Sequence, residues 1–171
     1  SPASVDAVQD LQQWSLRFPN LKDLCLGFSL IPDLKATVLL QILEDIGSLK
    51  TLEQLSCYFP VTPPQEALGQ VLKAHKDLRS LSIGFTLFCF INCKELEGIL
   101  KGVEDLTKLE YLKVTRVSKD DQLSKSAYKS LKKVFQNLPN LLRATFGFNS
   151  RMVSSRLYLK QIGRASCRER V

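Results

Sequence analysis

The stretch that decides the fold is Leu21-Lys22-Asp23-Leu24-Cys25-Leu26-Gly27-Phe28, because its apolar pattern recurs along the chain. An apolar residue stands at the first, fourth and sixth positions of this phrase and of four later copies. The five copies begin at Leu21, Leu52, Leu78, Leu109 and Leu141, which are 31, 26, 31 and 32 residues apart. A period of this size is typical of a stack of one repeated supersecondary unit, and it argues against a closed single-core domain.

Each phrase predicts a short strand, and each spacer predicts a helix. In the first copy Leu24 and Leu26 alternate with Cys25 and Gly27, which is the period of a half-buried strand. The spacers carry apolar residues at helical spacing and are long enough for about three turns. Strands joined by helices must be parallel and adjacent. The sequence therefore predicts parallel strands at 22–27, 53–58, 79–84, 110–115 and 142–147, with helices between them.

On these residues the chain resembles the leucine-rich repeat family, whose phrase is L-x-x-L-x-L-x-x-N/C. The resemblance covers roughly residues 11–149, and the long helical spacers are similar to the ribonuclease-inhibitor-like subclass. It implies an α/β solenoid, an open horseshoe with parallel strands on its inner face and helices on its outer face. We expect residues 1–160 to form one such domain of about five repeats, a monomeric module of a longer protein.

The last residues of the chain are predicted to lie outside this domain. Residues 162–171 look like the translation of a common sequencing adapter, and they show no hydrophobic period. We interpret 161–171 as a non-native tail and leave it out of the fold argument.

The outward strand positions are the predicted contact surface. The resemblance implies that partners dock on the inner face, where the side chains between the inward leucines are exposed. Tyrosine and arginine are enriched among the residues that dominate binding energy in interfaces. We therefore predict a non-catalytic protein-interaction module, acting as an adaptor or scaffold for a protein partner. The predicted partner-binding residues are Lys22, Asp23, Gln54, Tyr58, Arg79, Ser82, Tyr111, Lys113, Arg143 and Thr145.

A basic segment supports an alternative function. The formal net charge of the chain is +7, and residues 124–160 hold eight basic side chains and no acidic one. Such a segment can attract nucleic acid or another anionic surface. The competing interpretation is the solvated face of an outer helix, since helix faces are commonly charged. The basic residues are Lys125, Lys129, Lys132, Lys133, Arg143, Arg151, Arg156 and Lys160.

Catalysis, cofactors and metals find little support in the sequence. The single histidine, His75, lies among lysines with no nucleophile placed beside it, and the phosphate-binding and zinc-protease motifs are absent. Cys89 and Cys93 lack the second pair of ligands that a zinc site needs. We predict that the protein is not an enzyme and needs no cofactor or metal.

The predicted location is intracellular and cytoplasmic. Cys57 takes a core leucine position and Cys25 faces outward, so the five cysteines do not form a disulfide framework. No stretch approaches the roughly 18 apolar residues of a membrane span.

Overall fold

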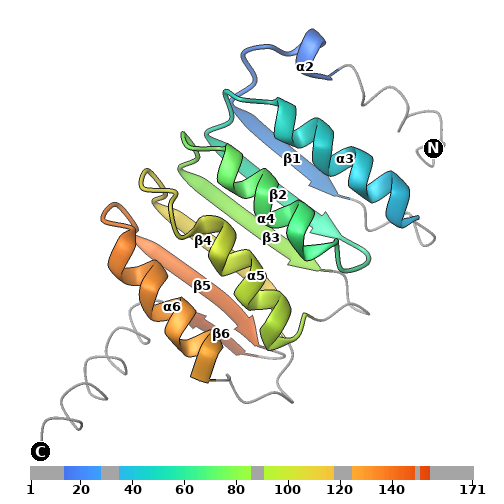
Figure 1. Ribbon diagram of the computed structural model, residues 1–171. Helices are drawn as coiled ribbons and strands as arrows, with labels where there is room; N and C mark the ends of the chain where they lie inside the picture. Colours follow the sequence, from blue (N-terminus) through green and yellow to red (C-terminus); the bar gives the residue numbers. More distant parts are fainter. Residues whose placement is uncertain (1–13, 28–34, 86–90, 118–124, 149–150, 155–171) are drawn as a thin grey trace, which may run out of the picture.

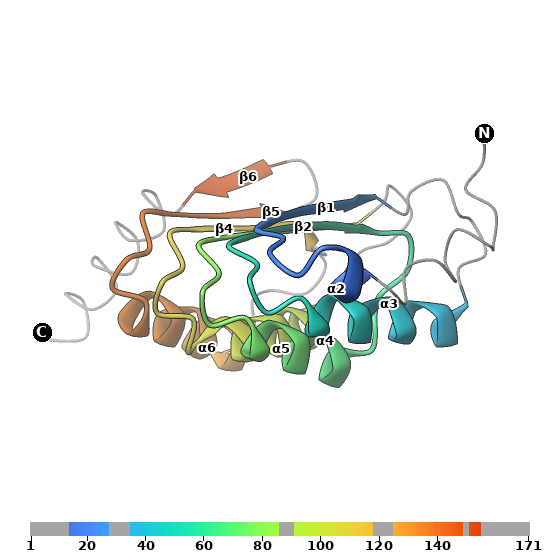
Figure 2. The same cartoon turned by 90° about the horizontal axis from the view of Figure 1, so that it is seen from above.

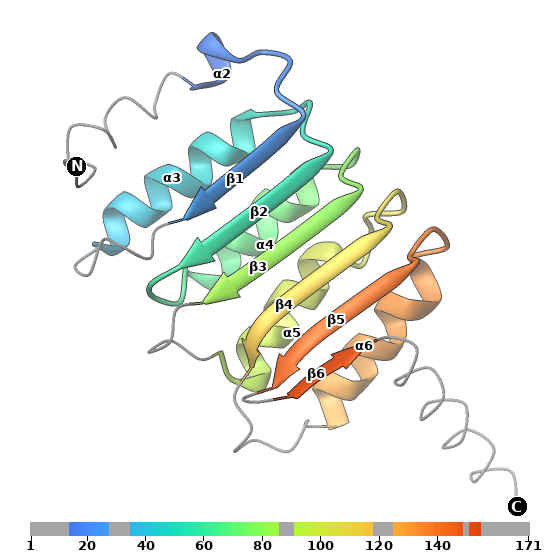
Figure 3. The same cartoon turned by 180° about the vertical axis from the view of Figure 1, so that it is seen from behind.

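The computed structural model describes residues 14–27, 35–85, 91–117, 125–148 and 151–154. Within these residues one sheet has the strand order β1-β2-β3-β4-β5-β6, so strands adjacent in sequence are also adjacent in space (Figures 1 and 3). The strands are β1 (Asp23–Gly27), β2 (Gln54–Phe59), β3 (Ser80–Phe85), β4 (Tyr111–Val117), β5 (Arg143–Phe148) and β6 (Arg151–Ser154).

The helices lie on one face of the sheet. Figure 2 shows α3, α4, α5 and α6 in a single layer beneath the strands. The helices are α2 (Trp14–Arg17), α3 (Ala36–Ser48), α4 (Gln65–Ala74), α5 (Cys93–Val103) and α6 (Lys125–Asn137). No described helix covers the opposite face of the sheet (Figure 2). The result is an open α/β sheet with one helical face and one bare face.

The five predicted strands are confirmed, and they pair in parallel without a register slip between β1 and β4. Each begins one residue later than predicted. The residue before each strand still joins the ladder, as when the Lys22 carbonyl accepts from the amides of both Glu53 and Gln54 at 2.8 and 2.9 Å. The same two-donor pattern recurs at the carbonyls of Glu53, Arg79 and Glu110. This repetition holds equivalent positions of the five units side by side.

The sixth strand was not predicted. β6 pairs antiparallel with β5, with Phe146 opposite Val153 and Thr145 opposite Ser154. An antiparallel pair needs only a short connection, whereas a parallel pair needs a crossover. β6 therefore follows β5 without an intervening helix and ends the parallel series.

The core lies between the sheet and the helices. Its strand side consists of two inward rows that follow the register across the sheet. The first inward row is Leu24, Leu55, Leu81, Leu112 and Ala144, and all five are buried. The second is Leu26, Cys57, Ile83, Val114 and Phe146, of which Leu26 is partly buried and the rest are buried. Phe59 and Phe85 extend the core near the ends of their strands, with ring centroids 6.2 Å apart.

Two glycines bring α4 and α5 into close contact. A Cβ atom built on Gly102 would lie 3.1 Å from the Gly69 Cα and 3.2 Å from its carbonyl oxygen. Such a contact is tighter than most side chains accept, so the absence of a side chain at Gly102 permits this helix pair to approach. The start of α5 is fixed by a capping box, in which the Glu95 amide donates to Asn92 at 2.9 Å and the Asn92 amide donates to Glu95 at 2.7 Å.

Candidate binding face

The bare face of the sheet carries three outward rows that interleave with the inward rows, and the third is a short one of Gly27, Tyr58 and Gly84. The first outward row is Asp23, Gln54, Ser80, Tyr111 and Arg143. The second outward row is Cys25, Ser56, Ser82, Lys113 and Thr145. The predicted alternation therefore holds on every parallel strand, and it places residues from five separate stretches of sequence on one surface.

Most of the predicted partner-binding residues lie at exposed positions. Tyr58 and Tyr111 are the aromatic side chains of the set, with 38% and 47% of their surface exposed. Ser82 is partly exposed. The exposed members are Lys22, Asp23, Gln54, Tyr58, Arg79, Tyr111, Lys113 and Arg143.

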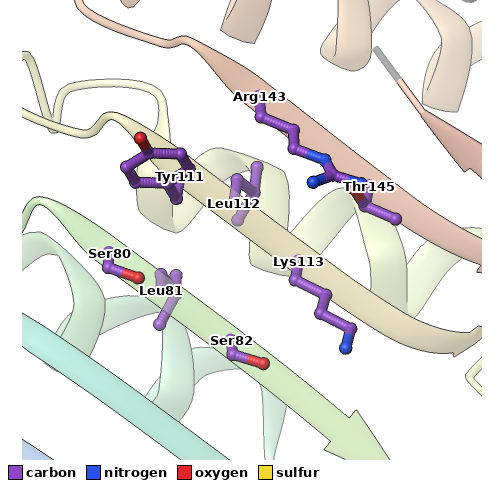
Figure 4. Close-up of a pocket in the computed structure, with 8 residues that line it drawn as sticks. All are labelled: Ser80, Leu81, Ser82, Tyr111, Leu112, Lys113, Arg143 and Thr145. Atoms are coloured by element: carbon purple, nitrogen blue, oxygen red, sulfur yellow. The ribbon is translucent and has the colours of Figure 1, made fainter.

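Thr145 differs from the prediction. It occupies an outward position but is only 6% exposed. Figure 4 shows the long side chain of Arg143, two residues earlier on the same strand, extending along β5 toward Thr145. A short side chain beside such a neighbour is shielded from solvent, and the alternation of a single strand carries no signal of this.

A row of alternating charges precedes the strands at their amino ends. We call Lys22, Glu53, Arg79 and Glu110 the edge row. Lys22 Nζ lies 3.1 Å from Glu53 Oε1, and Arg79 Nη1 lies 3.4 Å from Glu110 Oε1. Each cation therefore has an acidic neighbour from the next unit. Lys22 and Arg79, predicted as contact residues, already have partners within the fold.

A second charge pair lies in the turns behind the edge row. The Lys108 ammonium donates to the Asp77 carboxylate, and this hydrogen bond lowers the pKa of Asp77. Both side chains are exposed, so the pair adds little to stability. Asp77 and Lys108 thus neutralise each other's charge in the turns of adjacent units.

A hollow of about 370 Å³ opens on the bare face between β3, β4 and β5. We call it the cationic hollow. Figure 4 shows Arg143 extending along β5 toward Thr145, with Lys113 and Tyr111 on β4 and the two serines on β3. Among the described residues, neither Lys113 nor Arg143 forms an ion pair. The lining residues are Ser80, Leu81, Ser82, Tyr111, Leu112, Lys113, Arg143 and Thr145.

Tyr58 lies across the neighbouring strand. A Cβ atom on Gly84, its register partner on β3, would come within 2.4 Å of Tyr58 Cδ1 and 3.2 Å of Thr115 Oγ1. Gly84 is accordingly buried although it faces outward. The glycine thus makes a seat for the tyrosine ring, which fixes one aromatic surface on the bare face. The sequence carries a signal for this contact, because Tyr58 and Gly84 stand at the same position of the second and third phrases.

The basic segment of the alternative prediction lies elsewhere. Lys125, Lys129, Lys132 and Lys133 are exposed on α6, in the helical layer on the other side of the sheet (Figure 2). Lys133 Nζ lies 3.7 Å from Glu104 Oε2, which partly balances its charge. Among the basic residues of the segment whose side chains are described, Arg143 is the one on the bare face. Arg151 lies in β6, and Arg156 and Lys160 lie outside the described residues.

His75 is buried in the core. It is 1% exposed, and neither ring nitrogen has a hydrogen-bond partner among the described residues. Burial lowers the pKa of His75 below its ordinary value, and the positive charge of Lys50 lowers it further. The backbone of Ile46 acts in the opposite direction, by a smaller amount. An inaccessible neutral imidazole is poorly placed for acid–base chemistry on a substrate.

His75 occupies a position that holds leucine in other units. The amides of Leu49, His75 and Leu106 each bond back to the end of their own helix, and the carbonyls of His75, Leu106 and Leu138 each accept from the first leucine of the next phrase. His75 therefore stands at a position that holds leucine in the second, fourth and fifth units. The signal was visible in the alignment of the five copies.

The two cysteines whose side chains are described differ in environment. Cys25 is exposed and Cys57 is buried, and both are free. Burial raises the pKa of the Cys57 thiol to about 12, so it remains protonated. Cys89 lies outside the described residues. Within the part of the chain that the structure describes, no three His, Cys, Asp or Glu residues gather as a metal site would require.

A search of the described helices for membrane spans finds none of sufficient length and hydrophobicity. Comparison of the chain with models of known protein families gives no match, and comparison with curated proteins gives none either.

Proposed function

We propose that this protein is a leucine-rich repeat module, non-catalytic, that binds a protein partner on the outward rows of its sheet. The observation that carries the proposal is the bare face itself. Five parallel strands present their outward residues side by side, and no described helix covers them (Figures 2 and 3).

The repeat assignment is supported by equivalence between units. The same apolar positions fall in the same inward rows, and the same backbone carbonyls accept two amides in successive units. Turn side chains also link one unit to the next, as when Thr51 Oγ1 donates to the Leu21 carbonyl at 2.7 Å and Asn140 Nδ2 donates to the Thr107 carbonyl at 2.8 Å. A stack of units joined only to their neighbours is the architecture of repeat proteins.

A binding role for the face is supported by its side chains. Tyr58 and Tyr111 offer aromatic surface at positions two units apart, and Tyr58 is held in place by its seat on Gly84. Aromatic side chains with few rotatable bonds lose little entropy on binding and dominate many interfaces.

The experiment is capture of proteins from cell extract on the immobilised chain, quantified by mass spectrometry. Tyr58→Ala and Tyr111→Ala should each lower capture of the same partner by about tenfold, since loss of an interface anchor commonly costs 1.4 kcal/mol or more. The matched controls are Lys129→Glu and Lys132→Glu on α6. They reverse exposed charges on the helical side without breaking the Lys133–Glu104 pair. Circular dichroism and melting curves establish that all four variants remain folded.

The electrostatic alternative predicts the opposite pattern. An anionic ligand bound by α6 would be lost in the lysine variants and in added salt, and would tolerate the tyrosine variants. That pattern would contradict binding through the outward rows.

A further inference from the structure

We propose that the cationic hollow binds an acidic side chain carried by an extended segment of the protein partner. This inference rests on the proposed function, because it names the chemistry of the contact at one place on the same face.

The distribution of charge on the face is the first argument. The cations of the edge row face acids of the same chain, at 3.1 Å for Lys22–Glu53 and 3.4 Å for Arg79–Glu110. Lys113 and Arg143 have no such neighbour among the described residues. Glu110, the acidic residue nearest to Lys113 in sequence, accepts a hydrogen bond from Arg79. The hollow therefore has two positive charges that no acidic residue balances in the part of the chain that the structure describes.

The lining chemistry is the second argument. Ser80, Ser82 and Tyr111 line the hollow together with Arg143 and Lys113. Figure 4 shows Ser82 on the same side as the Lys113 ammonium, whereas the Tyr111 hydroxyl points away from both cationic groups. A carboxylate accepts several hydrogen bonds, and an arginine can hold both of its oxygens. The guanidinium of Arg143 is therefore the donor in the lining best suited to a carboxylate.

The wall of the hollow suits the rest of such a side chain. Leu81 and Leu112 are each 1% exposed because their side chains point into the core, so the strand backbone forms the floor at these positions. The Tyr111 ring is 47% exposed and offers a surface against which the methylene groups of a glutamate can lie.

The number and position of the cations favour a protein over a nucleic acid. A nucleic acid is bound by cations that neutralise several successive phosphates. The exposed lysines of α6 lie on the far side of the sheet and cannot extend the hollow into such a track (Figure 2). Two cations in one hollow match one or two acidic side chains.

The first arm of the test measures peptide binding by fluorescence anisotropy. The probes are two labelled nine-residue peptides that alternate threonine with glutamate or with glutamine. We expect the glutamate peptide to bind at least about tenfold more tightly, which corresponds to 1.4 kcal/mol. Lys113→Gln combined with Arg143→Gln should remove that difference. The matched control, Lys129→Gln with Lys132→Gln, changes the net charge equally and should leave affinity within about twofold.

Three results would overturn the inference. The glutamate peptide could show no preference over the glutamine peptide. The α6 control could lose as much affinity as the hollow variant, which would indicate general attraction between charges. A peptide with phosphoserine, or a single-stranded oligonucleotide, could bind more tightly than the glutamate peptide and still depend on Lys113 and Arg143, which would make a phosphate the preferred ligand.

The second arm separates this inference from the proposed function. The hollow variant is added to the capture experiment beside Tyr58→Ala. Loss of capture in both supports both proposals. Loss only in Tyr58→Ala refutes the acidic contact while the binding face remains, and unchanged capture in both variants refutes the two proposals together.

Discussion

The inward and outward rows of the sheet come from the same strands, yet they differ in how they vary from unit to unit. The first inward row holds four leucines and one alanine, whereas the outward row beside it holds Asp, Gln, Ser, Tyr and Arg. An inward side chain must fill space against its neighbours and the helices, so each unit accepts nearly the same residue. An outward side chain has no helix packed against it, although Tyr58 lies against Gly84 and Thr145 is buried. The comparison teaches that repetition marks what holds the stack together, and that its absence marks the positions free to differ, where the proposed partner would bind.

The largest expected effect comes from the inward side. Leu81→Ala should lower the free energy of unfolding by about 2–5 kcal/mol, because it leaves a cavity in the central unit. Leu81 is 1% exposed, and its neighbours in the row are also leucines. Leu142→Ala is the matched control, since this leucine is 68% exposed and should cost about 0.5 kcal/mol or less. Urea denaturation of both variants measures the difference, and equal losses would erase the distinction between the two sides.

The next effect comes from the one polar residue at a repeated core position. His75→Leu should raise the free energy of unfolding by about 1–3 kcal/mol, because it removes a buried group without hydrogen-bond partners among the described residues and restores the leucine of the second, fourth and fifth units. Thermal denaturation at pH 7.5 measures this. A destabilised leucine variant would show that the imidazole has a role that its surroundings in the structure do not suggest.

His75 should also make stability depend on pH. The pKa of His75 in the folded state lies below its ordinary value of 6.5, so the unfolded chain binds the proton more readily. Above about pH 6.5 His75 is neutral in the folded and the unfolded state, so its full contribution to the free energy of unfolding is present. As pH falls below that value, the free energy of unfolding should drop by up to about 1.4 kcal/mol per pH unit until the folded-state pKa is reached. Urea titrations between pH 5.5 and 7.5 test this, and the slope should vanish in His75→Leu, because the chain has no other histidine.

A smaller effect should come from the seat of Tyr58. Gly84→Ala places a methyl group against the ring and should displace the tyrosine, at a cost of about 1 kcal/mol or less, because a half-exposed ring can move away. The same change in a Tyr58→Ala background should cost less, because the contact with the ring is gone and the contact with Thr115 Oγ1 at 3.2 Å remains. A double-mutant cycle by urea denaturation gives the coupling energy, and additive effects would mean that the two residues do not interact.

The smallest effect belongs to the edge row. Arg79→Ala and Glu110→Ala should show a coupling energy of about 0.2–1 kcal/mol at low salt, and less at high salt, because both side chains are partly or largely exposed. Urea denaturation at two salt concentrations measures it. A coupling that salt leaves unchanged would contradict a solvent-screened pair.

The fold was largely predictable because its determinants are local and repeated. Apolar and polar residues alternate within each phrase, so each phrase by itself predicts one strand and which of its side chains are buried. β6 was missed because one short strand without a repeat partner has no period to compare. The leucine position taken by His75 was missed because the comparison of the copies started at the first leucine of the phrase and left out the residue three places earlier.

The sequence predicts which positions of the candidate site face outward. It does not predict which of these side chains contact one another. Side chains from different units meet in the edge row and at Gly84, and the distance between them along the sequence hides such contacts. The distinction between Arg79, which has an acidic partner, and Arg143, which has none among the described residues, required the spatial neighbours of both.

The contact between Gly69 and Gly102 bears on the curvature of the sheet. Hydrogen-bonded strands are spaced by about 4.8 Å, whereas packed helices ordinarily need about 8–10 Å between their axes. In the proposed solenoid, a layer with one helix for each strand would be wider than its sheet and would bend the sheet around its bare face. The close approach of α4 and α5 at Gly69 and Gly102 narrows the helical layer at this point, which would relax the bend locally. On the proposed function, residues that a partner never touches would then help to set the arc on which it fits.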